Sequence, residues 1–221
     1  MIQVFKNRNE AGQLLANSLQ KYANNPDAII LALPRGGLPV AYEVAKALQV
    51  KLDIFIVRKL GVPGHDELAM GAIAWGDVMV LNEEIISGLS ISEQTIEAVK
   101  KVESQELKRR NIAYRDQKPF PIIENKIVIL VDDGLATGAT MRAAITALKQ
   151  LNPTKLIVAI PVAPPDACMD IRPTVDELVC LETPEPFYAV GAWYDDFSQT
   201  TDTEVRDILA AAEQIQFNNN S

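Results

Sequence analysis

Two adjacent carboxylates, Asp132 and Asp133, follow a run of apolar residues at 127–131. Because that run is rich in β-branched residues and lacks polar alternation, it predicts a strand buried on both faces. Neighbouring carboxylates repel a phosphate, but they accept charge-assisted hydrogen bonds from paired hydroxyl groups, each contributing roughly 1.5–3 kcal/mol. The pair therefore predicts a site for a diol at the carboxyl end of a buried strand.

Small and hydroxyl-bearing residues come directly after the two acids. Small side chains leave backbone N–H groups uncovered, and at the start of a helix these groups and the helix dipole favour an anion. Apolar residues at helical spacing follow, so we expect a helix that ends near Asn152 and Pro153. A diol beside a phosphate describes a ribose 5-phosphate. The loop residues expected at the phosphate are Ala136, Thr137, Gly138, Ala139 and Thr140.

Other phosphate-binding loops do not fit this segment. A P-loop needs Gly, four residues and then Gly-Lys-Ser/Thr. Here Gly134 and Gly138 are only four positions apart, and no lysine follows. The dinucleotide fingerprint GxGxxG is also absent from the sequence. The alternative that stays open is structural, with acids that only cap the next helix.

The segment 128–140 resembles the phosphoribosyl-pyrophosphate motif of the type I phosphoribosyltransferases, which has four hydrophobic residues, two acids and a Thr-Gly-x-Thr loop. It departs from the family pattern at Gly134, usually a branched apolar residue, and at Ala136, often a hydroxyl residue. The resemblance implies that Asp132 and Asp133 hold the ribose hydroxyls. It also implies that the loop beyond them holds the 5′-phosphate.

A second glycine loop follows the apolar run 28–33. Arg35, Gly36 and Gly37 stand between that predicted strand and a helix predicted over 38–48. The glycines could serve only the turn. Alternatively, the loop could be a second anion site, because ligands bind beside the carboxyl ends of strands in open α/β sheets. The loop resembles the family's pyrophosphate loop, which often contains a non-proline cis peptide bond.

Two adjacent cations, Arg58 and Lys59, follow a third predicted strand at 52–57. Such a pair is often just solvated, but beside the other two loops it would meet a departing pyrophosphate. The run 58–64 resembles the Arg-Lys…Pro-Gly run of adenine-type phosphoribosyltransferases. Val62 stands where that run has a basic residue, so the acceptor base stays unassigned.

A flexible loop at 60–68 is expected to close over the pyrophosphate and exclude water. It leads into a predicted hairpin, so that loop and hairpin together span 60–82, with a tight turn at Gly76 and Asp77. His65 is either a surface residue or a contact of the base or of the leaving group, and Glu67 is either solvated or a general acid.

The N-terminal segment and residues 183–200 are expected to form a small hood. Its aromatic residues Trp193, Tyr194 and Phe197 could stack on a base or pack on the core. Asp195 or Asp196 could reach a metal or a ring nitrogen, and no metal ligand is assigned.

Predicted strands and helices alternate along most of the chain. This order predicts an α/β fold with an open, mainly parallel twisted sheet and helices on both faces. We expect residues 1–221 to form a single domain with its core at about 27–182. The further predicted helices are 9–22, 83–88, 92–115, one from Pro164 and 202–215; the further strands are 155–160 and 177–181, and 187–193 is predicted extended.

Composition excludes several classes of protein. A formal net charge of −8 argues against non-specific nucleic-acid binding, which requires neutralisation of phosphates. The sequence has no apolar run of about eighteen residues, so no membrane span is expected. The two cysteines, Cys168 and Cys180, and the single histidine show no metal-ligand spacing, which favours reduced thiols in the cytoplasm.

The resemblance implies a phosphoribosyltransferase, a glycosyltransferase of nucleotide metabolism that uses phosphoribosyl pyrophosphate and Mg²⁺. Such an enzyme moves the phosphoribosyl group to a nitrogenous base and releases pyrophosphate. The expected catalytic residues, acting by positioning and charge stabilisation, are Asp132, Asp133, Arg35 and Lys59. The alternative is a non-catalytic protein of this fold that binds a nucleotide or phosphoribosyl pyrophosphate and regulates a partner. The resemblance also implies a homodimer.

Overall fold

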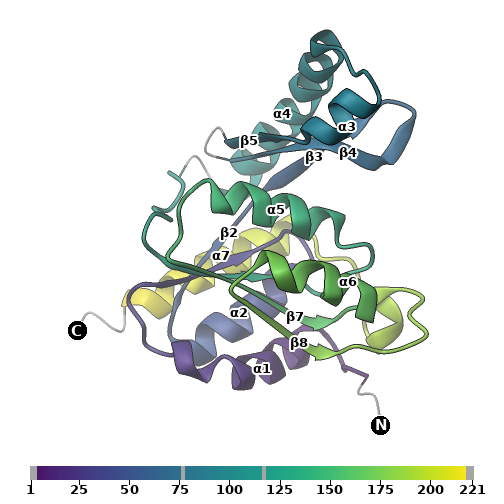
Figure 1. Ribbon diagram of the computed structural model, residues 1–221. Helices are drawn as coiled ribbons and strands as arrows, with labels where there is room; N and C mark the ends of the chain where they lie inside the picture. The colour runs from purple at the N-terminus through teal and green to yellow at the C-terminus, as the bar shows by residue number, and fades with distance from the viewer. Residues whose placement is uncertain (1–3, 76–77, 116–117, 218–221) are drawn as a thin grey trace. The chain divides into compact units, whose positions relative to one another are not determined.

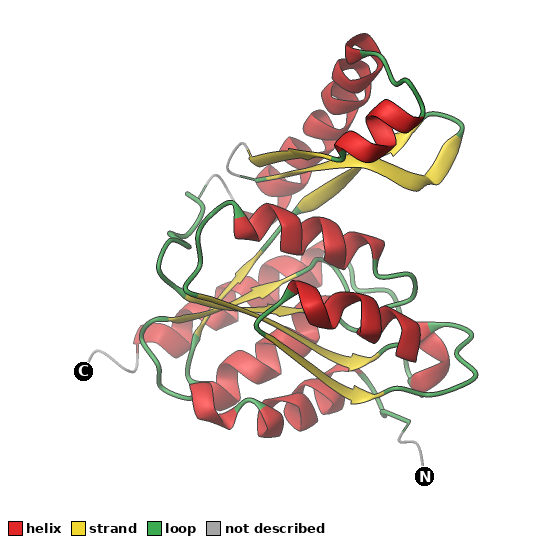
Figure 2. Ribbon diagram, viewed as in Figure 1, coloured by secondary structure: helices red, strands yellow, loops and turns green. Residues whose placement is uncertain are grey.

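The computed structural model describes residues 4–75, 78–115 and 118–217. The chain divides into two compact units (Figures 1 and 2). Unit 1 comprises Met1–Ile54, Pro121–Gly138 and Asn152–Ser221, and unit 2 comprises Phe55–Phe120 and Ala139–Leu151. That residues 1–221 act as a single domain stays a prediction.

Unit 1 is built on a five-stranded parallel sheet with strand order β2-β1-β6-β7-β8. Its central strands are buried almost throughout, because they consist of apolar runs that helices cover on both faces. The strand bounds are β1 Ala28–Ala32, β2 Lys51–Ile54, β6 Ile127–Val131, β7 Lys155–Val162 and β8 Glu177–Glu182.

The helices of unit 1 lie on both faces of this sheet (Figure 1). The connections through α2 and α6 step in opposite directions along the sheet, and right-handed crossovers then place these two helices on opposite faces. The predicted α/β class and open parallel sheet are therefore confirmed. The helix bounds are α1 Arg8–Ser18, α2 Gly37–Leu48, α6 Pro165–Ile171 and α7 Asp202–Phe217, with short 3₁₀ turns η1 Gln20–Tyr22, η2 Arg172–Thr174 and η3 Val190–Trp193.

Unit 2 contains a three-stranded antiparallel sheet of order β3-β4-β5. Its strands are β3 Val57–Val62, β4 His65–Ala74 and β5 Val78–Leu81, and its helices are α3 Glu83–Gly88, α4 Glu93–Arg115 and α5 Ala139–Lys149. The predicted hairpin and the helices at 83–88 and 92–115 are confirmed. The predicted turn at Gly76 and Asp77 lies outside the described residues.

The structure corrects the prediction for 52–68. The strand predicted at 52–57 is divided: β2 ends at Ile54 in the parallel sheet, and β3 begins at Val57 in the antiparallel sheet. The flexible loop predicted at 60–68 is also wrong, because β3 and β4 run through it and only Pro63 and Gly64 lie between them. Gly64 supplies the turn with a φ of +80°, while the apolar side chains of Val57, Leu60 and Val62 on β3 are buried.

Two smaller corrections concern unit 1. The helix predicted over 9–22 ends at Ser18 and is followed by η1. The segment 187–193, predicted to be extended, closes with η3. Helix α1 begins at Arg8, and the side chain of Asn7 caps it by accepting a hydrogen bond from the Glu10 N–H. Along the described part of the chain, none of the helices has the length and apolar character that a membrane crossing requires.

Candidate active site

Two loops of unit 1 leave the sheet side by side, at the carboxyl ends of β1 and β6. These strands are neighbours, with Ala32 opposite Val131, and the Leu33 N–H donates to the Val131 carbonyl at 2.9 Å. The register therefore brings the loop that starts at Pro34 against the loop that starts at Asp132. The predicted glycine loop and acid pair lie together.

Both glycines of the first loop are needed for this close approach. A Cβ on Gly37 would lie 2.8 Å from Asp132 Cα and 2.8 Å from the Val131 carbonyl oxygen. A Cβ on Gly36 would overlap the Asp133 carboxylate. The Pro34–Arg35 peptide bond is cis, which agrees with the resemblance.

The second loop continues from the acids to the start of α5. Leu135 N–H donates to the Val162 carbonyl at 3.0 Å, which ties the loop to β7. Gly138 has a φ of +71°, a conformation that favours glycine, and α5 begins at the next residue. Ala136, Thr137 and Thr140 are exposed, so this loop can receive a ligand from solvent.

The two acids form one coupled pair. The Asp133 N–H donates to Asp132 Oδ1 at 2.9 Å. Burial raises the pKa of Asp132 well above its usual range, and the neighbouring Asp133 carboxylate raises it further. Burial also raises the pKa of Asp133, although the Arg8 guanidinium opposes that change. Raised carboxylate pKa values in a cleft are typical of functional sites.

Arg8 is a site residue that the sequence interpretation missed. Its Nε and Nη2 each lie 2.8 Å from Asp133 Oδ2, and the two side chains are 11% and 14% exposed. A lone arginine at the first position of a helix, outside any motif, has no sequence signal that links it to the acids.

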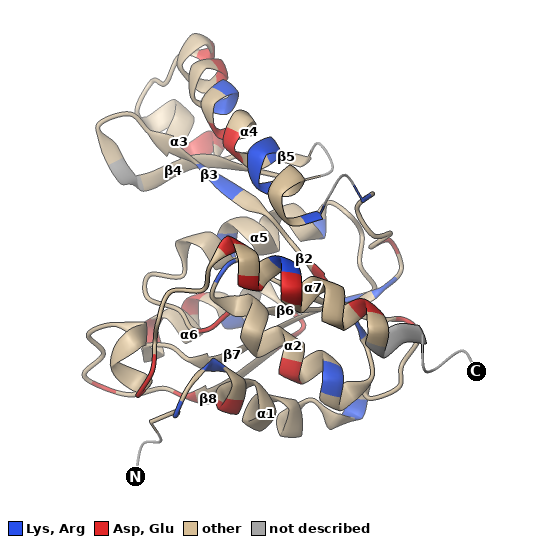
Figure 3. Ribbon diagram, turned by 180° about the vertical axis from the view of Figure 1, so that it is seen from behind, with Lys and Arg blue, Asp and Glu red and all other residues tan. Residues whose placement is uncertain are grey.

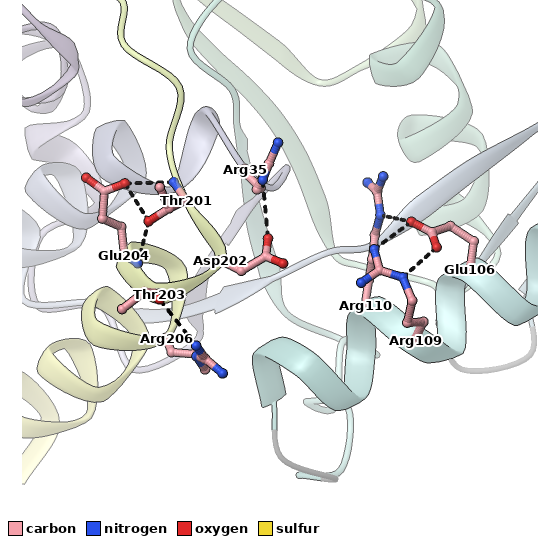
Figure 4. A network of polar contacts seen from close by, with 9 residues as sticks. All are labelled: Arg35, Glu106, Arg109, Arg110, Thr201, Asp202, Thr203, Glu204 and Arg206. Atoms are coloured by element: carbon pink, nitrogen blue, oxygen red, sulfur yellow. Dashed lines mark hydrogen bonds and ion pairs between the residues drawn. The ribbon is translucent and has the colours of Figure 1, made fainter.

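A second ion pair that the sequence did not indicate involves the glycine loop. Arg35 Nη1 lies 3.3 Å from Asp202 Oδ1, at the start of α7 (Figure 4). Arg35 side chain exposure is 35%, so its guanidinium remains accessible. The structure thus supports Arg35 as part of this edge and adds Asp202 as its acidic neighbour.

The N-terminal segment and residues 183–200 are joined by backbone hydrogen bonds. Phe5 N–H donates to the Trp193 carbonyl at 2.9 Å, and Asp195 N–H donates to the Phe5 carbonyl at 2.9 Å. Tyr194 is buried, packs between Phe5 and Phe197, and donates through its hydroxyl to the Asp133 carbonyl at 2.6 Å. Tyr194 therefore packs on the core; a hood over a base stays a prediction.

The cationic pair of unit 2 lies within the antiparallel sheet. Arg58 and Lys59 are on β3, and Arg58 Nε lies 2.6 Å from Glu103 of α4. They do not follow a strand of the parallel sheet, so that part of the prediction is wrong. Their contact with a pyrophosphate stays a prediction. His65 is exposed at the start of β4, and the Glu67 side chain lies outside the described set.

The charges on α4 form a surface network. Acidic and basic residues alternate along this helix (Figure 3). Glu106 accepts hydrogen bonds from Arg109 and Arg110 (Figure 4), which lower its pKa to about 2. Within the described ranges, there is no cluster of three His, Cys, Asp or Glu side chains that could hold a metal ion.

Comparison with known proteins decides the family. Residues 78–195, just over half of the chain, match the phosphoribosyl transferase domain. The chain belongs to the phosphoribosyl transferase family. A Mycobacterium tuberculosis protein, named provisionally as a phosphoribosyl transferase, is 41% identical over 204 residues, or 92% of this chain and 46% of that protein. The chain thus spans about half the length of the curated relatives it matches.

Solved structures of other proteins share the phosphoribosyl transferase fold. A Thermus thermophilus protein of known crystal structure is 38% identical, with a TM-score of 0.86 over 95% of this chain and 99% of that one. A hypoxanthine-guanine phosphoribosyltransferase from Bacillus anthracis is 11% identical, with a TM-score of 0.51 over 84% of this chain and 85% of that one. The second comparison shows the fold alone.

Proposed function

We propose that this chain transfers the phosphoribosyl group of phosphoribosyl pyrophosphate to a nitrogenous base, with release of pyrophosphate. The observation that carries the proposal is the meeting of the acid pair with the glycine loop, at the edge where the small-residue loop also leaves β6. Family membership and the M. tuberculosis relative, whose name refers to the same activity, support it.

The reaction requires positioning more than protein nucleophile chemistry. A base nitrogen bonds to ribose C1 as the bond from C1 to the pyrophosphate oxygen breaks, and the electron pair leaves with the pyrophosphate. The transition state resembles an oxocarbenium ion, so fixed orientation and charge stabilisation supply the catalysis. In the proposal, Asp132 and Asp133 accept from the ribose hydroxyls and the 136–140 loop binds the 5′-phosphate.

The leaving pyrophosphate is assigned to Arg35, Gly36 and Gly37. Arg35 is half-exposed and paired with an exposed acid. Because exposed ion pairs contribute only about 0–1 kcal/mol, exchanging Asp202 for a pyrophosphate oxygen costs little. Arg58 and Lys59 are proposed as further contacts of the pyrophosphate.

A divalent cation fits this edge on charge. Arg35 is the cationic residue of the glycine loop and the acid loop. In the proposal it meets a pyrophosphate that carries several negative charges. Mg²⁺ bound to substrate phosphate oxygens would neutralise that charge as the pyrophosphate departs. We assign no side chain to the ion. We further propose a cytoplasmic homodimer, which light scattering on the purified chain and imaging of a tagged copy would check.

The direct test is pyrophosphate release from phosphoribosyl pyrophosphate and Mg²⁺ against a panel of purine and pyrimidine bases. Release with one base class, lost in Asp133→Asn and kept in Lys126→Gln, would support the proposal. Lys126 pairs with Asp27 at the opposite end of the sheet, so it controls for the loss of one charged group. Stabilisation by phosphoribosyl pyrophosphate without release from any base would overturn the enzyme assignment and favour a regulatory binder.

A further inference from the structure

The Arg8 side chain has a polar or aromatic neighbour at every part of its guanidinium. Nε and Nη2 contact Asp133 Oδ2, each at 2.8 Å, and Nη1 donates to the Ser198 carbonyl at 2.7 Å. The Phe197 ring centroid lies 4.0 Å from the central carbon of the guanidinium. The cation–π contact, the two hydrogen bonds from Nε and Nη1, and the ion pair of Nη2 together favour one orientation of the guanidinium.

This orientation encloses the Asp133 carboxylate. Gly36 lies so close to Asp133 Oδ2 that a Cβ on Gly36 would overlap this oxygen. Arg8, at the start of α1, donates a hydrogen bond to the same oxygen. Tyr194 donates to the Asp133 backbone carbonyl and fixes the main chain beneath the side chain. The carboxylate therefore has little freedom to rotate away from the edge of the sheet.

We propose that Arg8 is the positioning residue of the ribose-binding carboxylate, holding Asp133 in place and charged so that it accepts from a sugar hydroxyl. The inference rests on the proposed function and deepens it. Arg8 acts through Asp133, and the 197–198 segment holds Arg8 in turn. The N-terminal helix is thereby part of the machinery that recognises the sugar.

Charge is the second part of the inference. The titratable groups that face the Asp133 carboxylate are Asp132 from its own loop, Arg8 from α1 and Tyr194 from the end of η3. Arg8 is the group that most favours a charge on Asp133, and a hydrogen bond with the Asp132 side chain makes a smaller contribution in the same direction. Burial without Arg8 would raise the pKa of Asp133 further, and the neutral acid would accept a hydroxyl hydrogen bond more weakly.

The experiment measures the affinity of the full chain for two probes, ribose 5-phosphate and inorganic phosphate, by calorimetry from about pH 5 to 9. The ratio of the two affinities isolates the contribution of the sugar from that of the phosphate loop. The variants are Arg8→Gln, Arg8→Lys and the control Lys126→Gln, which loses the same charge at the other end of β6.

Arg8→Gln should lower the ratio about tenfold, and the midpoint of its pH dependence should move to higher pH. Arg8→Lys should lie between Arg8→Gln and wild type, because lysine keeps the charge and loses the planar fork. Lys126→Gln should match wild type. If Arg8→Gln does not fold, the ratio and midpoint of Arg8→Lys decide the question.

Equal weakening of both probes by Arg8→Gln, with an unmoved pH midpoint, would reduce Arg8 to a purely structural role and overturn the inference. An unchanged ratio would overturn it as well. In both cases the proposed function stands, provided that the wild-type chain prefers ribose 5-phosphate. A wild-type chain without that preference would instead remove the proposed function and the inference together.

Discussion

Carboxylates at the two ends of the parallel sheet of unit 1 have pKa values that are shifted in opposite directions. At the carboxyl ends of β1 and β6, burial raises the pKa of Asp132 and of Asp133. At the amino ends of β7 and β8, burial also acts on Glu177, but hydrogen bonds from Lys21, Tyr22 and Lys155 outweigh it and lower the pKa to about 2.

The difference lies in how completely the protein itself pairs each carboxylate. Glu177 Oε2 accepts from the Tyr22 hydroxyl at 2.7 Å and from Lys155 at 3.2 Å, and Lys21 lies 2.8 Å from Oε1, so its charge is fully matched by protein donors. Asp132 has no such cationic partner among the described contacts. The proposed function uses this difference, because a carboxylate whose partners are incomplete in the protein can accept hydrogen bonds from a ligand's hydroxyl groups.

The largest expected effect comes from Gly36→Ala. The new Cβ must displace the Asp133 carboxylate, which also breaks its contact with Arg8. We expect affinity for ribose 5-phosphate to fall roughly 30- to 100-fold, which is about 2–3 kcal/mol. The matched control is Gly61→Ala, since no described atom lies within 4 Å of a Cβ at that position. Equal affinities of the two variants in calorimetry would contradict the close approach.

Asp133→Asn should weaken ribose 5-phosphate about tenfold or more, because it removes one charge-assisted hydrogen bond from the diol. The free energy of unfolding should fall as well, because the buried Arg8 guanidinium loses its charged partner. Calorimetry and chemical denaturation on the same samples check both expectations. An unchanged affinity would argue against the ribose role.

Glu177→Gln should lower stability without lowering affinity. It removes the charge that Lys21, Tyr22 and Lys155 surround, so the unfolding free energy at pH 7 should fall by roughly 1–2 kcal/mol. Affinity for ribose 5-phosphate should stay within about twofold of wild type, because Glu177 lies at the other end of the sheet. A large loss of affinity without loss of stability would remove the contrast between the two ends.

The smallest expected effects are two opposite dependences of the unfolding free energy on pH. The folded pKa of Glu177 is depressed, so its stabilisation is present above about pH 4.5 and is lost as pH falls towards about 2. The folded pKa of Asp132 is raised, so its contribution is present at low pH and is lost as pH rises through that pKa.

Denaturation curves across pH, compared with wild type, measure this pair. The destabilisation by Glu177→Gln should shrink as pH falls, by less than about 1 kcal/mol for each pH unit. Asp132→Asn should instead gain stability relative to wild type as pH rises. Parallel curves for the two variants would show that the acids share one environment.

Local sequence patterns predicted the central buried strands and the loops that follow them. The runs at 28–33 and 127–131 are apolar throughout, so they predicted buried strands, and parallel pairing of these strands brings the glycines and acids after them to one edge of the sheet. The run 52–57 was misassigned because a short apolar segment does not reveal that its halves pair in two different sheets. The turn residues near Pro63 and Gly64 suggested a long loop, whereas antiparallel pairing satisfied the backbone up to the turn itself.

The sequence by itself determined the family and predicted the parallel sheet and the two loops, because residue type and spacing within single segments, and the alternation of strands and helices along the chain, indicate them. Only the tertiary structure decided that Arg8 holds Asp133 and that Asp202 pairs with Arg35. Arg8 and Asp133 are 125 positions apart, and a contact across that distance leaves no periodicity in either segment. It exists because the order of strands in the sheet brings a helix start and a strand end to the same place.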